Sequence, residues 1–181
     1  METLVVVGLR NFGYNGTRHN IAEAVLLELA KTRNISFSRN KDGSEICDHS
    51  PNVILALPKT FMNLSGKPVK HLLSKPYNPS NLLVVHDELD LALGKAKVRA
   101  LGGSARGHNG LKSIIASLGG LEKFPRVLVG IDRPNSKDPE VISRHVLGKF
   151  TSKDSVLLDA GIDLAVSVVE QEIAKWQAQH K

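Results

Sequence analysis

An unbroken run of apolar, mostly β-branched residues near the start of the chain constrains the fold more than any other stretch. Leu4–Val7 reads L-V-V-V, and a strand that is apolar on both faces is typical of the buried centre of a parallel-type sheet. Gly8 ends the run, and a turn rich in Asn and Gly leads to Thr17, which we expect to cap a helix. The pattern therefore places Asn11 and His19 at the carboxyl end of a strand, where open α/β sheets bind their ligands.

Strand and helix patterns alternate along the 181 residues, which predicts an α/β fold in one domain spanning residues 1–181. Further strands are expected at Asn52–Leu57, Leu82–Val85, Lys95–Arg99 and Val127–Ile131. Further helices are expected at Ser65–Lys75, Leu111–Leu118 and Ser152–Gln179, the last with an apolar stripe through Val156, Leu157, Ala160, Leu164, Val168, Val169 and Trp176. Residues 32–50 are polar and show no regular pattern, so we expect no helix or strand there. In the last helix, Gly161 is expected to cost roughly 1 kcal/mol of stability relative to Ala.

Composition narrows the class of protein. No apolar run reaches the roughly 20 residues that a membrane span needs, and the N-terminus lacks the basic and apolar regions of a secretory signal. Cys47 is the single cysteine, which is typical of a protein from a reducing compartment. The net charge of +6 permits a polyanionic partner such as a nucleic acid, although many basic proteins bind none.

Histidine and carboxylate side chains follow two of the expected strands. The helix dipole disfavours a charged imidazole at a helix amino end, so His19 is expected to be neutral and able to accept a proton. The alternative is a surface or capping histidine. His86–Asp90 contains three carboxylates directly after a strand, and one of them fits best as a group that orients His19. Metal ligation and solvated acids are the alternatives, and no metal-binding motif occurs.

Two loops add hydrogen-bonding groups. The segment 61–66, F-M-N-L-S-G, places Asn63 between aliphatic neighbours, so we expect a semi-buried amide that can both donate and accept. The alternative is that this segment caps a helix while Phe61 and Met62 fill the core. Gly102–Gly110 would let backbone approach an anion at a helix amino end, but it matches no nucleotide-binding motif. His108 and Asn109 stand in the same loop.

A strip of cations precedes that loop. Lys95–Arg99 alternates strictly, which predicts a half-buried strand with Lys95, Lys97 and Arg99 on one face. Together with Arg106, these side chains would align a polyanion beside the expected site. The alternative is a solvated edge strand whose lysines prevent aggregation.

Taken together, the motifs resemble the bacterial-type peptidyl-tRNA hydrolases over essentially the whole chain. The matching stretches are G-L-R-N-F-G…T-R-H-N (8–20), F-M-N-L-S-G (61–66), H-D-E-L-D-L (86–91) and G-H-N-G-L-K (107–112), in the family's order. The resemblance implies a mixed, twisted central sheet flanked by helices. It also implies hydrolysis of the ester between a peptide and the 3′ ribose of tRNA, without metal or cofactor.

The resemblance assigns a role to each matching residue. His19 corresponds to the general base that activates water, and Asp87 corresponds to the carboxylate that orients it. The substrate-binding positions implied by the family are Asn11, Tyr14, Met62, Asn63, His108 and Asn109. The tRNA-binding positions expected from the family and the cationic strip are Lys95, Lys97, Arg99 and Arg106. The expected protein is a monomer that binds the acceptor stem and 3′ end of peptidyl-tRNA, does not bind membranes, and is cytoplasmic or, if eukaryotic, mitochondrial.

Some positions depart from the family pattern. Phe12 replaces the usual Pro after the first Asn, and the loop that follows is two residues shorter. Ala22 replaces a common Gly, and Leu128 stands where many bacterial members have Arg. These differences concern loop shape and tRNA contacts, and they leave the expected catalytic pair intact.

Three rival classes are open at this point. A non-catalytic tRNA-binding or ribosome-associated protein would explain the charge but not the polar residues. A metallopeptidase or phosphorylase on a similar sheet would explain those residues. A serine or cysteine hydrolase fits least, because Cys47 lies in a polar connector and no G-x-S-x-G elbow occurs.

Overall fold

The computed structural model describes residues 2–73 and 77–180 and has one mixed sheet at its centre. The strands are β1 (Leu4–Gly8), β2 (Ser38–Arg39), β3 (Glu45–Ser50), β4 (Val53–Leu57), β5 (Leu82–Glu88), β6 (Ala96–Arg99) and β7 (Arg126–Gly130). Their order is β2-β3-β4-β1-β5-β7-β6. The four central strands β4, β1, β5 and β7 are parallel, while β2, β3 and β6 run antiparallel at the edges. The expected mixed α/β sheet is confirmed.

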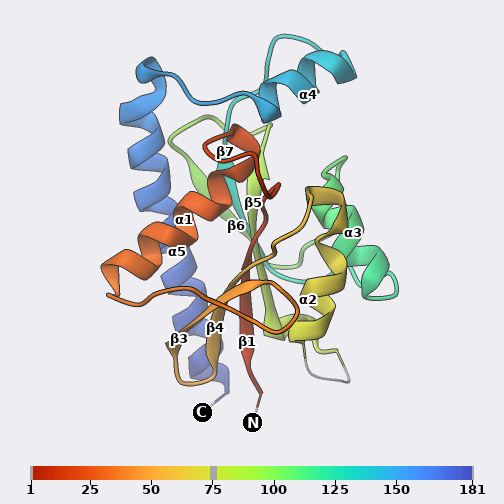
Figure 1. Ribbon diagram of the computed structural model, residues 1–181, viewed down its shortest axis with the longest axis vertical. Coiled ribbons are helices and arrows are strands. Elements are labelled where there is room, and N and C mark those ends of the chain that lie inside the picture. The colour runs from red at the N-terminus through yellow and green to blue at the C-terminus, as the bar shows by residue number, and fades with distance from the viewer. Residues whose placement is uncertain (1, 74–76, 181) are drawn as a thin grey trace.

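Helices cover both faces of the sheet (Figure 1). They are α1 (Ile21–Thr32), α2 (Gly66–Leu72), α3 (Asn109–Ser117), α4 (Pro139–Leu147) and α5 (Ser155–Gln179), with 3-10 turns η1 (Arg18–Asn20), η2 (Met62–Leu64), η3 (Pro79–Asn81) and η4 (Ser152–Asp154). Leu4 and Val6 pack with α1 and α5, and Val5 and Val7 pack with α2 and α3. Strand β1 is therefore buried on both faces, which explains its unbroken apolar run. The predicted helix Ser65–Lys75 is confirmed up to Leu72, and Lys75 lies outside the described residues.

The first helix begins differently from the prediction. Thr17 does not cap it; the Thr17 hydroxyl donates to the carbonyl of Tyr14 at 2.8 Å. A single 3-10 turn, η1, follows and carries His19, and Asn20 occupies the cap position of α1. The polar turn residues before Thr17 bond to one another, so the hydroxyl is used inside the turn rather than by the helix.

Residues 32–50 were expected to be irregular, and this prediction is wrong. They contain the hairpin β2–β3, in which Ser38 pairs with Ile46 and Arg39 with Glu45. The hairpin lies at the edge of the sheet, and among the residues of β3 only Cys47 is buried. A polar edge hairpin needs no continuous apolar run, so the pattern that identifies central strands does not find it.

The last helix is confirmed, but its buried face matches the predicted stripe only at Val169 and Trp176. Val156, Leu157 and Leu164 are 77%, 52% and 39% exposed. The buried residues of the helix are spaced by three or four: Gly161, Ala165, Val169, Ile173 and Trp176. A Cβ atom at Gly161 would lie 3.0 Å from Cα of Gly94, so this glycine allows a close approach to the chain just before β6.

Helix α4 was not predicted, although its start carries a recognisable signal. The Asp138 carboxylate accepts from the backbone N–H of Glu140 at 2.8 Å, and Pro139 occupies the first turn. None of the residues of α4 is buried, which explains the absence of a strong apolar stripe. Within residues 2–73 and 77–180, no helix combines the length and the hydropathy needed to cross a membrane.

Candidate active site

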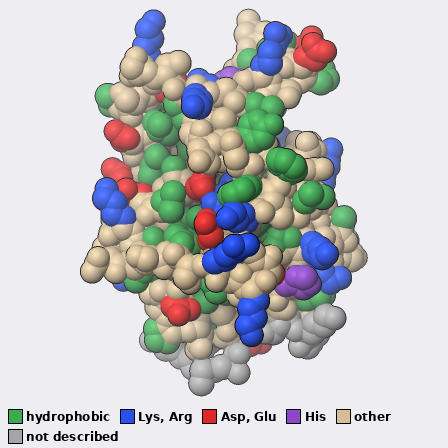
Figure 2. Space-filling model, in the orientation of Figure 1, with side chains coloured by type: hydrophobic (Ala, Val, Ile, Leu, Met, Phe, Trp, Pro, Cys, Tyr) green, Lys and Arg blue, Asp and Glu red, His purple; other side chains and the backbone are tan. Residues whose placement is uncertain are grey.

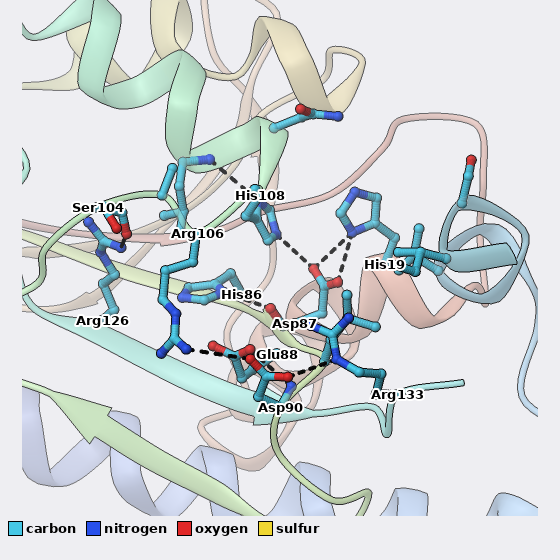
Figure 3. A pocket seen from close by; sticks show the side chains of 18 of the residues that line it. His19, His86, Asp87, Glu88, Asp90, Ser104, Arg106, His108, Arg126 and Arg133 are labelled. Atoms are coloured by element: carbon cyan, nitrogen blue, oxygen red, sulfur yellow. Dashed lines mark hydrogen bonds and ion pairs between the residues drawn. The ribbon is translucent and has the colours of Figure 1, made fainter. Parts of the chain in front are cut away.

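The polar residues converge at the carboxyl edge of the parallel strands, as expected. The loop after β1 supplies Asn11, η1 supplies His19, and the segment after β4 supplies Met62. Strand β5 is three residues longer than predicted and includes Asp87. The glycine-rich loop brings His108 from the other face of the sheet to the same point (Figure 3). Five parts of the chain therefore meet at this edge.

Asp87 lies between two histidines. Its two carboxylate oxygens are each 2.9 Å from Nδ1 of His19, and its Oδ1 is 2.8 Å from Nε2 of His108. An ionised carboxylate only accepts hydrogen bonds, so both nitrogens must be donors. His19 therefore has its proton on Nδ1 when neutral, which leaves Nε2 as a base.

The second histidine is fixed in one tautomer. Nδ1 of His108 accepts from the backbone N–H groups of Gly110 and Leu111, at 3.1 and 3.4 Å, and so caps helix α3. A nitrogen that accepts from the backbone has no proton of its own, so the proton is on Nε2, facing Asp87. His108 was expected near the substrate; the structure shows it bound to Asp87.

The charges of the cluster depend on one another. Burial raises the pKa of Asp87, but the neighbouring His19 and His108 lower it more, so this pKa lies well below its usual range. Burial lowers the pKa of His19, but the charge of Asp87 and the hydrogen bond to it raise it more, to above 6.5. The expectation that its surroundings disfavour a charged His19 is therefore wrong in direction, because Asp87 favours the charged ring. His19 acts as a base once the pH rises above this pKa.

His86, which precedes Asp87, has a structural function that the sequence did not reveal. It is buried, and its Nδ1–H donates to the backbone carbonyl of Asp87 at 2.7 Å. Burial, together with the nearby His108, lowers the pKa of His86 to about 3, so this ring is neutral near pH 7. It therefore supports Asp87 without adding a charge to the site.

Asn11 is held firmly at the edge of the site. Its Oδ1 accepts from the backbone N–H of Met62 at 3.0 Å, and its own backbone N–H donates to Oδ1 of Asn20 at 2.8 Å. Asn20 is buried and was not singled out from the sequence, although it stands in T-R-H-N next to His19. Met62 is buried, as the core interpretation of this segment proposed, but Phe61, which that interpretation also placed in the core, is 58% exposed. Asn63 is exposed, so the expectation of a semi-buried amide is wrong.

A cavity of about 430 Å³ opens beside the histidines. Residues along its wall include His19, Asp87, His108, Asn109, Arg99 and Arg106. At its mouth, Asp90 pairs with Arg133 at 2.8 Å and with Arg106 at 3.5 Å (Figure 3). The predicted residues Asn11, Tyr14, Met62 and Asn63 are not part of this wall. Asn11 and Tyr14 belong to the loop after β1, and Met62 and Asn63 to the turn η2 after β4.

Arg126 is a further residue that sequence analysis missed. It is completely buried, and its guanidinium donates to the backbone carbonyls of Gly103, Ser104 (2.9 Å) and Glu122 (3.1 Å). Burial and the charge of Arg99 lower its pKa to about 10. Nothing in the local pattern marks this arginine as buried, because it stands at the first position of β7 after an aromatic and a proline. It fastens the glycine-rich loop that bears Arg106 and His108.

The cationic strip is confirmed as a strand at the edge of the sheet. Lys95 and Lys97 are exposed, and Arg99 is partly buried beside its strand partner Arg126. Figure 2 shows Lys and Arg side chains spread over the face it displays rather than gathered into one patch. The position at the edge fits both the tRNA-binding and the solvated-edge interpretation of this strip.

Three ligand atoms with metal-binding chemistry lie together. Nitrogen atoms of His19 and His108 and a carboxylate oxygen of Asp87 all fall within 4.8 Å of one another. Two imidazoles and one carboxylate are suitable ligands for a divalent ion. In this structure the same atoms are hydrogen-bonded to one another at 2.8–2.9 Å.

The fold and the site define a small α/β enzyme with one mixed sheet and a carboxylate-bound histidine at its carboxyl edge. The peptidyl-tRNA hydrolase family model matches residues 5–181. A peptidyl-tRNA hydrolase from Actinobacillus pleuropneumoniae serotype 3 is 42% identical over 173 residues, covering 92% of this chain and 88% of its own length. One from Lactiplantibacillus plantarum is 40% identical over 177 residues, covering 94% and 92%.

Solved structures agree with this assignment. The crystal structure of peptidyl-tRNA hydrolase from Acinetobacter baumannii has a TM-score of 0.80 and 33% identity, covering 98% of this chain and 93% of that one. The chain therefore belongs to the peptidyl-tRNA hydrolase family. It is an ester hydrolase that acts on peptidyl-tRNA, and the expected family and activity are confirmed. The non-catalytic, metallopeptidase and serine or cysteine hydrolase alternatives are set aside by this assignment.

Proposed function

We propose that His19 is the general base that activates water for hydrolysis of the ester, and that Asp87 orients it. The observation on which this rests is the contact of both Asp87 oxygens with Nδ1 of His19 at 2.9 Å. Because Nδ1 is bound in this way, Nε2 is the nitrogen available to a water molecule. The carboxylate also stabilises the imidazolium that forms when the proton is taken.

The reaction then follows a two-stage course. Nε2 of His19 takes a proton from water while the water oxygen attacks the carbonyl carbon, and a tetrahedral oxyanion forms. The oxyanion collapses, the bond from carbon to the ribose oxygen breaks, and His19 returns the proton to that oxygen. The products are a peptide with a free carboxyl group and a tRNA with a free ribose hydroxyl group. The number of protons is conserved, and His19 ends as it began.

Amide side chains on both sides of the pair are proposed to hold the substrate. Oδ1 of Asn11 is occupied by the Met62 backbone, so its NH₂ group is the part that faces outward to a ligand. Asn63, in the turn after β4, and Asn109, at the start of α3, are exposed amides. Amide N–H groups of this kind stabilise an oxyanion or bind the peptide carbonyls. Tyr14 and Met62 are proposed to shape the same region.

The tRNA body is proposed to lie along β6. Lys95 and Lys97 are exposed at this edge of the sheet, and Arg99 and Arg106 line the cavity beside the histidines. Cations in this arrangement neutralise backbone phosphates and position the acceptor stem without taking part in bond breaking. The enzyme is further proposed to act as a monomer in the cytoplasm or, as the alternative, in the mitochondrial matrix.

The experiment that tests this proposal is hydrolysis of N-acetyl-aminoacyl-tRNA by wild type and His19→Ala. Release of the acyl-amino acid is measured in single-turnover assays, and tRNA binding is measured separately. We expect the substitution to lower the rate by on the order of 10²–10⁴-fold, the usual size of a general-base contribution, with binding nearly unchanged. A His19→Ala enzyme with near wild-type turnover would remove His19 from the mechanism. The same assay with EDTA tests the expected independence from metal ions.

A further inference from the structure

Solvent-exposed aromatic side chains are concentrated at one place on the molecule. The chain has five Phe, two Tyr and one Trp. Three of these are exposed: Phe12 by 40%, Tyr14 by 43% and Phe61 by 58%. They lie on two neighbouring loops, which are joined by a hydrogen bond from the backbone N–H of Phe12 to the carbonyl of Thr60 at 3.0 Å. Apolar rings clustered on a surface are typical of a binding site rather than of solvent-facing loops.

This cluster lies directly beside the proposed catalytic pair. Asn11 stands next to Phe12 in the sequence, and its Oδ1 accepts from Met62 at 3.0 Å. The backbone of Asn11 is bonded to the side chain of Asn20, the residue after His19. The loop that carries Phe12 is therefore joined to the turn that carries His19.

The ring of Phe12 lies near Arg10, a cation that is fixed in place by other contacts. The guanidinium carbon of Arg10 lies 5.5 Å from the ring centroid of Phe12. Arg10 is buried and is held by ion pairs to Glu23 at 2.6 Å and to Glu45 at 2.7 Å. These contacts keep the ring in place while two-fifths of it stays open to solvent.

Lys59 is the second cation at this ring, and it differs from Arg10. Its Nζ is 4.9 Å from the ring centroid of Phe12, and the side chain is exposed. Among the residues that the structure describes, Lys59 has no carboxylate partner in an ion pair. An exposed ring beside an exposed, unpaired ammonium is the combination with which proteins bind single-stranded nucleic acid: the ring stacks on a base and the cation pairs with a phosphate.

We propose that Phe12 and Lys59 form a binding subsite for the unpaired 3′ end of the tRNA. Phe12 stacks on one base, and Lys59 pairs with an adjacent phosphate. The proposal rests on the proposed function, since it names how the same site holds its substrate. If Phe12 had a purely structural role, it would shield the ion pairs of Arg10 from water. Phe12→Leu would preserve that role.

The test uses an RNA hairpin that ends in single-stranded CCA, is not acylated and carries a fluorescent label. A second hairpin has the three unpaired bases replaced by abasic residues. Binding is measured by anisotropy for wild type, Phe12→Leu, Phe12→Trp and Tyr77→Leu. Tyr77 is the matched control, because Lys70 lies 5.9 Å from its ring. We expect Phe12→Leu to weaken binding of the CCA hairpin roughly fivefold or more, and Phe12→Trp and Tyr77→Leu to bind as wild type does.

The abasic hairpin separates stacking from general damage. It should bind wild type and Phe12→Leu equally, and Lys59→Gln should lower the log–log salt slope for the CCA hairpin by about 0.7. Unchanged binding of the CCA hairpin by Phe12→Leu would overturn the proposal, as would an equal loss for both hairpins. The hairpins contain no ester, so these results do not depend on turnover. A His19→Ala enzyme that binds the hairpins as wild type does and keeps near wild-type turnover would refute the proposed function alone.

Discussion

His108 links Asp87 to the first turn of helix α3. Its Nε2 donates to the carboxylate at 2.8 Å while its Nδ1 accepts from two backbone N–H groups of the helix. The ring therefore has one possible orientation and one tautomer, and Asp87 receives a permanent second donor. The glycine-rich loop and the proposed catalytic pair are consequently joined through a single side chain.

Replacing His108 should therefore reduce catalysis although the residue does not act as the base. His108→Ala removes a hydrogen bond to a charged group, worth about 1.5–3 kcal/mol, so we expect kcat/KM to fall roughly 10–150-fold. Steady-state kinetics with N-acetyl-aminoacyl-tRNA measures this. Circular dichroism and thermal unfolding control for loss of the α3 cap. An unchanged kcat/KM would show that Asp87 does not need this donor.

The pH dependence of the rate tests the pairing of His19 with Asp87. Because the pKa of His19 is raised above 6.5, activity should increase with pH through a midpoint above 6.5 as His19 loses its proton. In Asp87→Asn the raising charge is gone and burial remains, so the midpoint should move to lower pH. The maximal rate should also fall, on the order of 10³–10⁴-fold, as for other orienting carboxylates. A midpoint that does not move would contradict the electrostatic role of Asp87.

Acid stability tests the buried His86. In the unfolded chain this ring binds a proton near pH 6.5, whereas in the folded protein its pKa is about 3. The unfolded state therefore binds the extra proton between these values, and stability is lost as the pH falls below about 6.5. We expect His86→Asn to lose less free energy of unfolding than wild type between pH 7 and 4.5, by up to about 2–3 kcal/mol. Urea titrations at both pH values measure the difference, and an equal loss in both proteins would contradict the assignment.

The salt dependence of tRNA binding tests the strip along β6. If Lys97 contacts a phosphate, Lys97→Ala should weaken binding and reduce the log–log salt slope by about 1. The rate at saturating substrate should change little, because phosphate contacts position the tRNA. Lys31→Ala is the matched control: this exposed lysine lies in α1 and pairs with Glu28. A slope equal to that of wild type would place the tRNA on another surface and favour the solvated-edge interpretation.

The central fold could be predicted from sequence because its signals are local. The apolar run Leu4–Val7 predicts a strand buried on both faces, and the parallel strands β4 and β5 also begin with apolar runs. The hairpin of β2 and β3 and the helix α4 escaped prediction because their burial is slight. The buried face of α5 depends on the approach of Gly161 to Gly94, 67 positions apart in the chain, and no local pattern reports such a contact.

The candidate site was predictable in part, for a similar reason. Residues at strand ends, such as Asp87 and His19, could be brought together by topology alone. The supporting residues could not: Arg126 and Asn20 act through backbone groups of distant segments, and their side-chain types give no sign of it. Asn63 stands in the 3-10 turn η2, in which Met62 alone is buried, so the apolar residues beside it in the sequence do not bury this amide.

Asp90 is shared by two arginines that come from opposite sides of the cavity mouth. Arg106, Asp90 and Arg133 are 54%, 47% and 40% exposed, and exposed ion pairs of this kind contribute only about 0–1 kcal/mol each. The residues at the mouth of the cavity are thus held by ion pairs that thermal motion and dissolved salt readily break. Asp87, in contrast, is fixed by the register of β5 between two neighbouring strands, and it holds His19 through hydrogen bonds of 2.9 Å. The mouth of the cavity is therefore held by weaker contacts than the pair proposed to carry out the reaction.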